Sequence, residues 1–401
     1  MARPLNPAEL KIDLLCNGLK TDLPPELEEE SFPLSGSIAG LGSGMEMVLP
    51  SDPRDVWVNV PVAEEFTGRS PYRLEGSGAR TRIRDTRNGF DYPVRLVPRP
   101  AWYGKSTSRG VPMSVIATLQ GTCLAILIGE RCRFWKKEEA LNCKFCSTGL
   151  EAGWDHRIDI AVEDAVETAQ AAREESDVSI VLLQAGYQGS GGLRKAFPYL
   201  KAIKREVGLL VGIQFNPEPD LGLYDQAVSL GADHLCFSFE FYDPEHFHRY
   251  LPGKAAVIGR RQFFSAMEYC ARRMGRGRVS GQIIAGIEPL KDTLRAVEYI
   301  GYIGASPLVC VFRPLRGTEL EHRAPPKYED MLKVFRHVYE TCRSRKLPVG
   351  VVPNINWSLS LQPEDTFYLA RDSAIDRLYR QWIWALRLLM RPYFLRQLRR
   401  P

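Results

Sequence analysis

The chain has 401 residues, of which 44% are hydrophobic and 25% charged, a composition typical of a folded globular protein. No apolar run reaches the roughly 18–20 residues of a transmembrane helix, and the N-terminal segment lacks the pattern of a secretion signal, so we expect a cytoplasmic protein. The formal net charge is +5, but residues 377–401 hold seven arginines and no acidic residue. The basic excess is therefore a property of the C-terminal tail and not of the body.

Three regions follow one another along the chain. Residues 1–105 are rich in glycine, proline and short β-branched runs, which predict a small β-rich N-terminal region. Residues 106–325 alternate apolar strands with amphipathic helices. Residues 326–401 form a C-terminal extension, with a helix expected over 326–345 and an extended return segment over 347–361. The extension ends in a basic amphipathic tail, in which Pro392 is expected to interrupt any helix.

The central region predicts a barrel. Its strand candidates are the six apolar runs 124–129, 178–186, 209–215, 234–241, 279–287 and 307–315. Helix candidates lie between them at 158–175, 193–207, 221–230, 255–273 and 290–303. This alternation indicates a parallel sheet covered by helices, because each crossover helix must bury its apolar stripe against the strands. A closed or partly closed (βα) barrel meets that requirement and places its chemistry at the C-terminal ends of the strands.

Three of the nine cysteines, Cys132, Cys143 and Cys146, lie in one loop directly after the first of these strands. An odd number of cysteines in a chain without an export signal favours reduced thiols or metal ligands over a disulfide framework. Zinc would require a fourth ligand, for which His156 is the nearest candidate. An iron–sulfur cluster held by three thiolates would leave one iron free for a substrate or cofactor. The cysteines alone leave both interpretations open.

The loop resembles that of the radical S-adenosylmethionine (radical SAM) superfamily, whose members carry CxxxCxΦC, with an aromatic Φ, after the first barrel strand. Phe145 fits the aromatic position, but ten residues separate Cys132 from Cys143 where the common motif has three. Segments similar to further superfamily signatures follow in the expected order at 184–189, 281–288 and 312–320. The last of these is similar to a segment of the biotin synthase and hydrogenase-maturase branch. Their joint order favours the iron–sulfur interpretation.

The resemblance implies that the three cysteines hold one [4Fe-4S] cluster, which binds S-adenosylmethionine (SAM). The turn containing Gly186 and Gln188 would contact the methionine amine, although the acidic residue usual in that turn is missing here. The segment that ends in Ile287 and Glu288 would lie against the adenine, and Phe312 follows on the next strand.

Side-chain alternation along the central strands predicts further SAM contacts. The residues on one face of the fourth strand are His234, Cys236, Ser238 and Glu240. Ser238 and Glu240 are expected near the ribose, and Gln214 of the third strand is expected to reach ribose or substrate. The basic residues after the fourth strand are Arg249, Lys254, Arg260 and Arg261. Of these we favour Arg260 for the SAM carboxylate.

The sequence thus predicts an α/β fold: a partial (βα)6 radical SAM (TIM-like) barrel with a β-rich N-terminal extension and a helical C-terminal extension. The implied reaction is oxygen-sensitive, reductive cleavage of SAM to a 5′-deoxyadenosyl radical that abstracts hydrogen from a small-molecule or peptide substrate. Rearrangement, bond formation and methylation stay open as outcomes, and a flavodoxin or ferredoxin would supply the electron.

Two further expectations concern the extensions. Because a six-stranded barrel leaves one side open, one or both extensions should cover that side and protect a radical from solvent. The basic tail is expected to contact a membrane surface, a polyanion or a partner protein, or to pack against the barrel. The alternative to an enzyme is a zinc-stabilised, non-catalytic binding protein that uses this tail.

Overall fold

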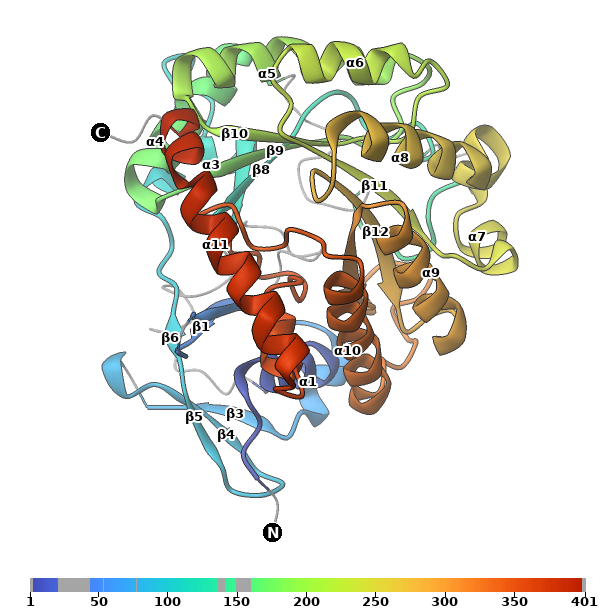
Figure 1. Cartoon of the computed structure of the whole chain (residues 1–401). Helices are drawn as coiled ribbons and strands as arrows, with labels where there is room; N and C mark the ends of the chain where they lie inside the picture. The colour runs from blue at the N-terminus through green and yellow to red at the C-terminus, as the bar shows by residue number, and fades with distance from the viewer. Residues whose placement is uncertain are drawn as a thin grey trace.

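The computed structural model describes residues 3–20, 44–52, 54–76, 78–135, 141–148 and 160–398. Its largest sheet has seven strands in the order β13-β12-β11-β10-β9-β8-β7. They are β7 (Ala117–Gln120), β8 (Cys123–Leu127), β9 (Ile180–Gln184), β10 (Leu210–Gln214), β11 (His234–Glu240), β12 (Val279–Ala285) and β13 (Ser306–Val311). Strands β8 to β13 pair in parallel and curl into a partial barrel (Figure 1), which confirms the predicted fold class and all six predicted strands.

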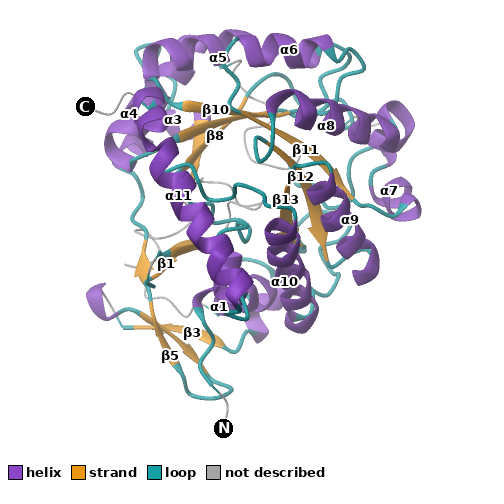
Figure 2. Ribbon diagram, viewed as in Figure 1, coloured by secondary structure: helices purple, strands orange, loops and turns teal. Residues whose placement is uncertain are grey.

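Helices cover the outer face of this sheet (Figure 2). They are α4 (Val162–Ser176), α5 (Phe197–Ala202), α6 (Gly222–Ser229), α7 (Pro244–Tyr250), α8 (Arg260–Met274) and α9 (Leu290–Tyr302). In α8 the buried residues Phe263, Met267 and Cys270 follow helical spacing and form the stripe that faces the sheet. A methyl group on Gly281 of β12 would lie 2.9 Å from side-chain atoms of Met267 and Ile300. This glycine therefore lets α8 and α9 pack closely on the strand.

Two details differ from the sequence prediction. The seventh strand, β7, pairs antiparallel with β8 at the sheet edge and was not predicted. The helix expected over 193–207 is divided into a 3-10 turn (Gly192–Ala196), α5 and a π-helical turn (Ile203–Val207). Pro198 lies in the first turn of α5, the position that proline prefers in a helix, so the chain starts a new helix there.

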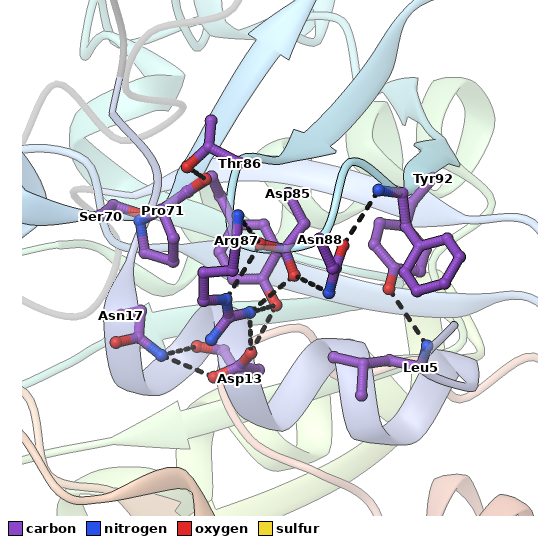
Figure 3. A network of polar contacts seen from close by, with 12 residues as sticks. Leu5, Asp13, Asn17, Ser70, Pro71, Asp85, Thr86, Arg87, Asn88 and Tyr92 are labelled. Carbon is purple, nitrogen blue, oxygen red and sulfur yellow. Dashed lines mark hydrogen bonds and ion pairs between the residues drawn. The ribbon is translucent and has the colours of Figure 1, made fainter. Parts of the chain in front are cut away.

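The N-terminal region contains α1 (Pro7–Asn17) and two three-stranded antiparallel sheets, ordered β2-β1-β6 and β3-β4-β5. Their strands are β1 (Met45–Leu49), β2 (Val56–Val60), β3 (Tyr72–Glu75), β4 (Arg82–Asp85), β5 (Asp91–Pro93) and β6 (Arg95–Leu96). Arg87 joins α1 to the second sheet, because its guanidinium donates to Asp13 at 2.6 Å and to Asp85 at 2.9 Å (Figure 3). The domain boundaries at 105 and 325 stay a prediction.

The C-terminal extension begins with α10 (Tyr328–Ser344) and continues in a return segment that contacts both edges of the barrel sheet. The Thr122 amide in the β7–β8 turn donates to the Asn356 carbonyl at 2.9 Å. Leu361 forms an isolated bridge with Val309 of the other edge strand, β13. The return segment thus joins the two edges of the partial barrel, as expected for an extension that covers the open side.

Two buried ion pairs bind the extensions to each other and to the barrel. Arg313, just after β13, donates to Glu64 of the N-terminal region at 2.5 Å, and both side chains are at most 5% exposed. Lys11 of α1 donates to Asp365, which follows the return segment, at 2.9 Å. Because removing one member of such a pair leaves a buried charge without a partner, these contacts fix both extensions on the barrel.

The last helix, α11 (Ala374–Gln397), is continuous, and the expectation that Pro392 would interrupt it is wrong. A capping box at Ser373 and Asp376 starts the helix. Proline removes only the hydrogen bond to the carbonyl of Leu388, a residue that is 49% exposed, so water can solvate that carbonyl. Neither α11 nor any other helix in the described part of the chain is long and apolar enough to cross a membrane.

Candidate active site

The first cysteine of the loop is fixed against the end of β9. The Tyr187 amide donates to Cys132 Sγ at 3.3 Å, and the Arg133 amide donates to the Tyr187 carbonyl at 3.0 Å. The rings of Phe134 and Tyr187 stack with centroids 4.6 Å apart. Gly186 makes room for the cysteine, since a methyl group there would lie 2.3 Å from Cys132 Cβ. The predicted turn at Gly186 therefore does contact the cysteine loop.

The second half of the loop is fixed against the segment after β11. The Gly253 amide donates to the Leu141 carbonyl at 3.0 Å, and the Lys144 amide donates to the Tyr250 carbonyl at 3.0 Å. Phe145 packs edge-on against Phe241, with ring centroids 6.0 Å apart. The two halves of the loop thus return to one end of the barrel, although ten residues separate the first two cysteines.

The three thiols of the loop act on one another electrostatically. Burial raises the pKa of Cys143 well above its ordinary value, and Cys132 and Cys146 add to that rise through their own negative charge. Burial raises the pKa of Cys146 as well, and Cys132 contributes again. Neutral thiols in this site are costly to ionise, so a bound cation would stabilise their thiolate forms.

The zinc alternative has a different geometric requirement. In the described ranges, no group of three or more His, Cys, Asp or Glu side chains is arranged to hold a single metal ion. His156, the suggested fourth zinc ligand, lies outside the described residues. The cysteines of an iron–sulfur cluster bind separate irons and do not have to converge on one point. Three cysteines in one loop are thus chemically the kind of donor set that such a cluster needs.

A buried ion pair lies beside these thiols. Lys254 Nζ donates to both carboxylate oxygens of Glu240 and to the Ser238 carbonyl, each at 2.8 Å. The lysine side chain is 9% exposed and the carboxylate 8%. The Lys254 charge also acts on Cys143, whose pKa it lowers against the dominant effect of burial. Lys254 is thus the basic residue of the four considered from the sequence that is named among the charges acting on Cys143.

Arg260, which the sequence interpretation favoured for the SAM carboxylate, lies in an aromatic cluster instead of in an ion pair. Its guanidinium carbon is 5.0 Å from the Tyr242 ring centroid and 4.5 Å from that of Phe264. Its Nε is buried and has no hydrogen-bond partner among the described residues. The role of Arg260 stays a prediction.

Polar side chains form a continuous layer across the inner face of the barrel. Gln184 donates to Gln214 at 2.8 Å, and Gln214 donates to Ser238 at 2.7 Å and to Gln282 at 2.6 Å. Gln282 donates in turn to the Cys310 sulfur at 3.6 Å. The two glutamines that sequence reasoning missed, Gln184 and Gln282, occupy the inner positions of β9 and β12, so the alternation that identified Gln214 and Ser238 could have found them.

The other predicted site residues are placed at strand ends and hold the local backbone. Gln188 is buried, and its amide both accepts from the Glu130 amide and donates to the Glu130 carbonyl, at 2.9 and 2.7 Å. Glu288 accepts from the amides of Tyr242 and Asp243, at 2.9 and 3.0 Å. Ile287 and Phe312 are buried. Polar atoms of Gln188 and Glu288 are thus engaged within the protein, and direct contacts of these four residues with SAM stay predictions.

A partial parallel barrel, three cysteines in the loop after its first parallel strand and three further motifs in order make this chain similar to the radical SAM superfamily. No family model matches the chain. It is 24% identical over 324 residues to the bacteriochlorophyllide c C-7(1)-hydroxylase of Chlorobaculum limnaeum, an alignment that covers 71% of this chain and 80% of that protein.

Solved structures with a similar arrangement include two of Streptococcus suis SuiB. The one bound to S-adenosylmethionine is 12% identical, with a TM-score of 0.42 over 56% of this chain and 48% of SuiB. The one bound to the precursor peptide SuiA is 11% identical, with a TM-score of 0.43 over 58% of this chain and 48% of SuiB. The chain thus matches about half the length of SuiB.

Proposed function

We propose that Cys132, Cys143 and Cys146 hold one [4Fe-4S] cluster at the C-terminal end of the barrel, and that the enzyme cleaves SAM there to start a hydrogen abstraction. The observation that supports this is the return of both halves of the loop to the ends of β9 and β11, at one end of the barrel. A bound cluster would supply the electron for cleavage of the SAM carbon–sulfur bond and so the 5′-deoxyadenosyl radical.

The residues of the chain would bind and orient the reactants. Lys254, whose three donors are engaged by Glu240 and the Ser238 carbonyl, would offset the negative charge of the Cys143 thiolate through its own charge. Gln214 and Ser238 present amide and hydroxyl groups on the inner face, suited to ribose hydroxyls or a polar substrate group. The return segment, which bonds to both edges of the barrel sheet, would limit water access from the open side of the barrel together with the N-terminal region.

The reaction proposed after SAM cleavage is abstraction of hydrogen from a carbon of a small organic substrate. The curated relative supports this subtype, since its name describes hydroxylation at the C-7(1) carbon of bacteriochlorophyllide c, a reaction that replaces a carbon–hydrogen bond. We therefore favour a small-molecule substrate over a peptide, and oxidation of a C–H bond over methylation. A flavodoxin or ferredoxin is the proposed electron donor.

Anaerobic reconstitution of the full chain tests this proposal. We expect about four irons per chain, and 5′-deoxyadenosine when SAM and a reductant are added. Cys132→Ala should lose most of the iron and the cleavage. Cys123→Ala is the matched control, because Cys123 lies at the start of β8, at the opposite end from the loop, and its thiol approaches the Asn356 carbonyl. One zinc per chain without iron, or full cleavage by Cys132→Ala, would contradict the proposal.

A further inference from the structure

The outer surface of α11 is unusually apolar. Ten large hydrophobic side chains are exposed in the described part of the chain, and seven of them belong to this one helix. They are Ile375, Leu378, Trp384, Leu388, Leu389, Tyr393 and Leu395, with exposed fractions from 42% to 75%. Such a concentration is rare on a soluble surface and marks a site of interaction.

The protein does not cover this surface, because α11 packs on the barrel through a different face. The packed face carries Tyr379 and Ile383, which are buried. Trp384, Leu388 and Leu395 are spaced i, i+4 and i+11, so they form a separate stripe directed away from Tyr379. The helix therefore uses one apolar face for its own fold and leaves a second one in contact with solvent.

Positive charge borders the exposed stripe. From residue 377 to residue 398 the helix has five arginines and no acidic residue. Arg377 and Arg380 lie beside Asp372, which precedes the helix. Arg391 and Arg396 form no ion pair with any described residue, so their charge is not neutralised within that part of the chain.

We infer that the outer face of α11 binds the surface of an anionic lipid bilayer, with the helix lying in the plane of the interface. An interfacial helix combines apolar and aromatic residues that enter the acyl boundary with arginines that meet anionic headgroups. Two copies joined through this face would bring their arginines together, and a nucleic acid would leave Trp384 and the leucines in water. Charge and apolar surface together therefore favour lipid.

The position of α11 sets the orientation of the bound enzyme. Gln397 accepts a hydrogen bond from Lys204, which also pairs with Asp233, the residue before β11. Near the start of α11, Tyr379 donates to the carbonyl of Leu347 in the segment after α10. The helix crosses one side of the molecule between α10 and α4 (Figure 1), and its C-terminal end lies near the N-terminal end of β11. The cysteine loop is at the opposite ends of the strands, so it would face away from the lipid.

Vesicle flotation of the full-length protein tests the apolar contribution. We expect it to float with phosphatidylcholine vesicles containing about one third phosphatidylglycerol, and to float much less with phosphatidylcholine alone. Replacing Trp384, Leu388 and Leu395 together by Gln should lower partitioning at least about tenfold. Tyr302→Gln is the matched control, because Tyr302 is 71% exposed on α9, and it should bind as wild type.

A second pair of variants tests how much the arginines contribute to vesicle binding. Arg391→Gln with Arg396→Gln should weaken binding about fivefold per arginine and reduce its salt dependence. Arg69→Gln with Arg80→Gln, at exposed positions of the N-terminal region, should have no effect. Equal binding to neutral and anionic vesicles, or no flotation at all, would overturn the inference. A wild-type protein that is dimeric, with a Trp384, Leu388 and Leu395 variant that is monomeric, would also overturn the inference. The same holds if that variant binds vesicles as well as wild type does.

Discussion

Replacing Gly186 by alanine should remove the cluster without unfolding the protein. A methyl group at this position would lie 2.3 Å from Cys132 Cβ and 3.0 Å from both its Cα and its Sγ. Ordinary carbon–carbon contacts are about 3.5–4.0 Å, so Cys132 would have to move by more than about 1 Å. The obstructing atoms include the Cys132 backbone, which cannot rotate away as the end of a flexible side chain can.

A displacement of this size should abolish cluster binding while the protein still folds. Overpacking of this kind costs about 1–3 kcal/mol in folding free energy, which most domains of this size survive. A metal site tolerates much less, since ligand distances are defined to about 0.2 Å. We therefore expect Gly186→Ala to fold, with a small decrease in melting temperature, and to bind well under half of the wild-type iron.

The assay is iron content and 5′-deoxyadenosine formation after anaerobic reconstitution, with circular dichroism as the test of folding. Gly104→Ala is the matched control, because a methyl group there meets no atom within 4 Å and the backbone is not left-handed. It should retain wild-type iron. A folded Gly186→Ala protein with full iron and full SAM cleavage would refute the view that Cys132 binds the cluster from its place against Gly186.

Three further predictions concern buried charges. Lys254→Met leaves the Glu240 carboxylate buried without its cation, which should lower the free energy of unfolding by about 3–5 kcal/mol in denaturant titrations, whereas an unchanged midpoint would contradict it. Arg313→Met removes the buried ion pair with Glu64 and should also lower the free energy of unfolding, by ~3–5 kcal/mol, most of which a second change, Glu64→Gln, should restore. Burial raises the pKa of Glu288 from an ordinary 4.5 to about 7, so the folded state binds its proton more tightly and stability falls as pH rises through that interval. Glu288→Gln should flatten that dependence in thermal unfolding, and a wild-type slope would exclude the carboxyl as its source.

The strands could be predicted because burial acts on both faces of a parallel sheet. Runs such as 124–129 and 178–186 are almost continuously apolar, and the structure places strands in both. The antiparallel strand β7 has only four residues, two of them polar and partly exposed, so it lacks that signal. The prediction that Pro392 would interrupt the helix was wrong because the carbonyl that loses its hydrogen bond, that of Leu388, lies on a turn of α11 exposed to solvent.

Residues of the candidate site could be predicted only where a motif or a strand alternation in the local sequence identifies them. The cysteines and Phe145 follow from a motif, and Gln214 and Ser238 from alternation along a strand. The choice among the basic residues after β11 depends on how the chain continues beyond α7. Contact between Gly253 and Leu141 turns Lys254 toward the thiols, and that contact joins segments more than 100 residues apart. No local signal in the sequence reports it.

The structure separates the proposed chemistry from the proposed lipid contact along the strands of one barrel. The cysteine loop meets the C-terminal end of β9, whereas Gln397 of α11 is joined through Lys204 to Asp233 before β11. Strands of five to seven residues at about 3.3 Å per residue hold these ends roughly 16–23 Å apart. Substitutions at the exposed α11 residues should therefore leave iron content and SAM cleavage unchanged. In the same way, Gly186→Ala should lose iron and still float with anionic vesicles. Each of the two proposals can thus fail while the other stands.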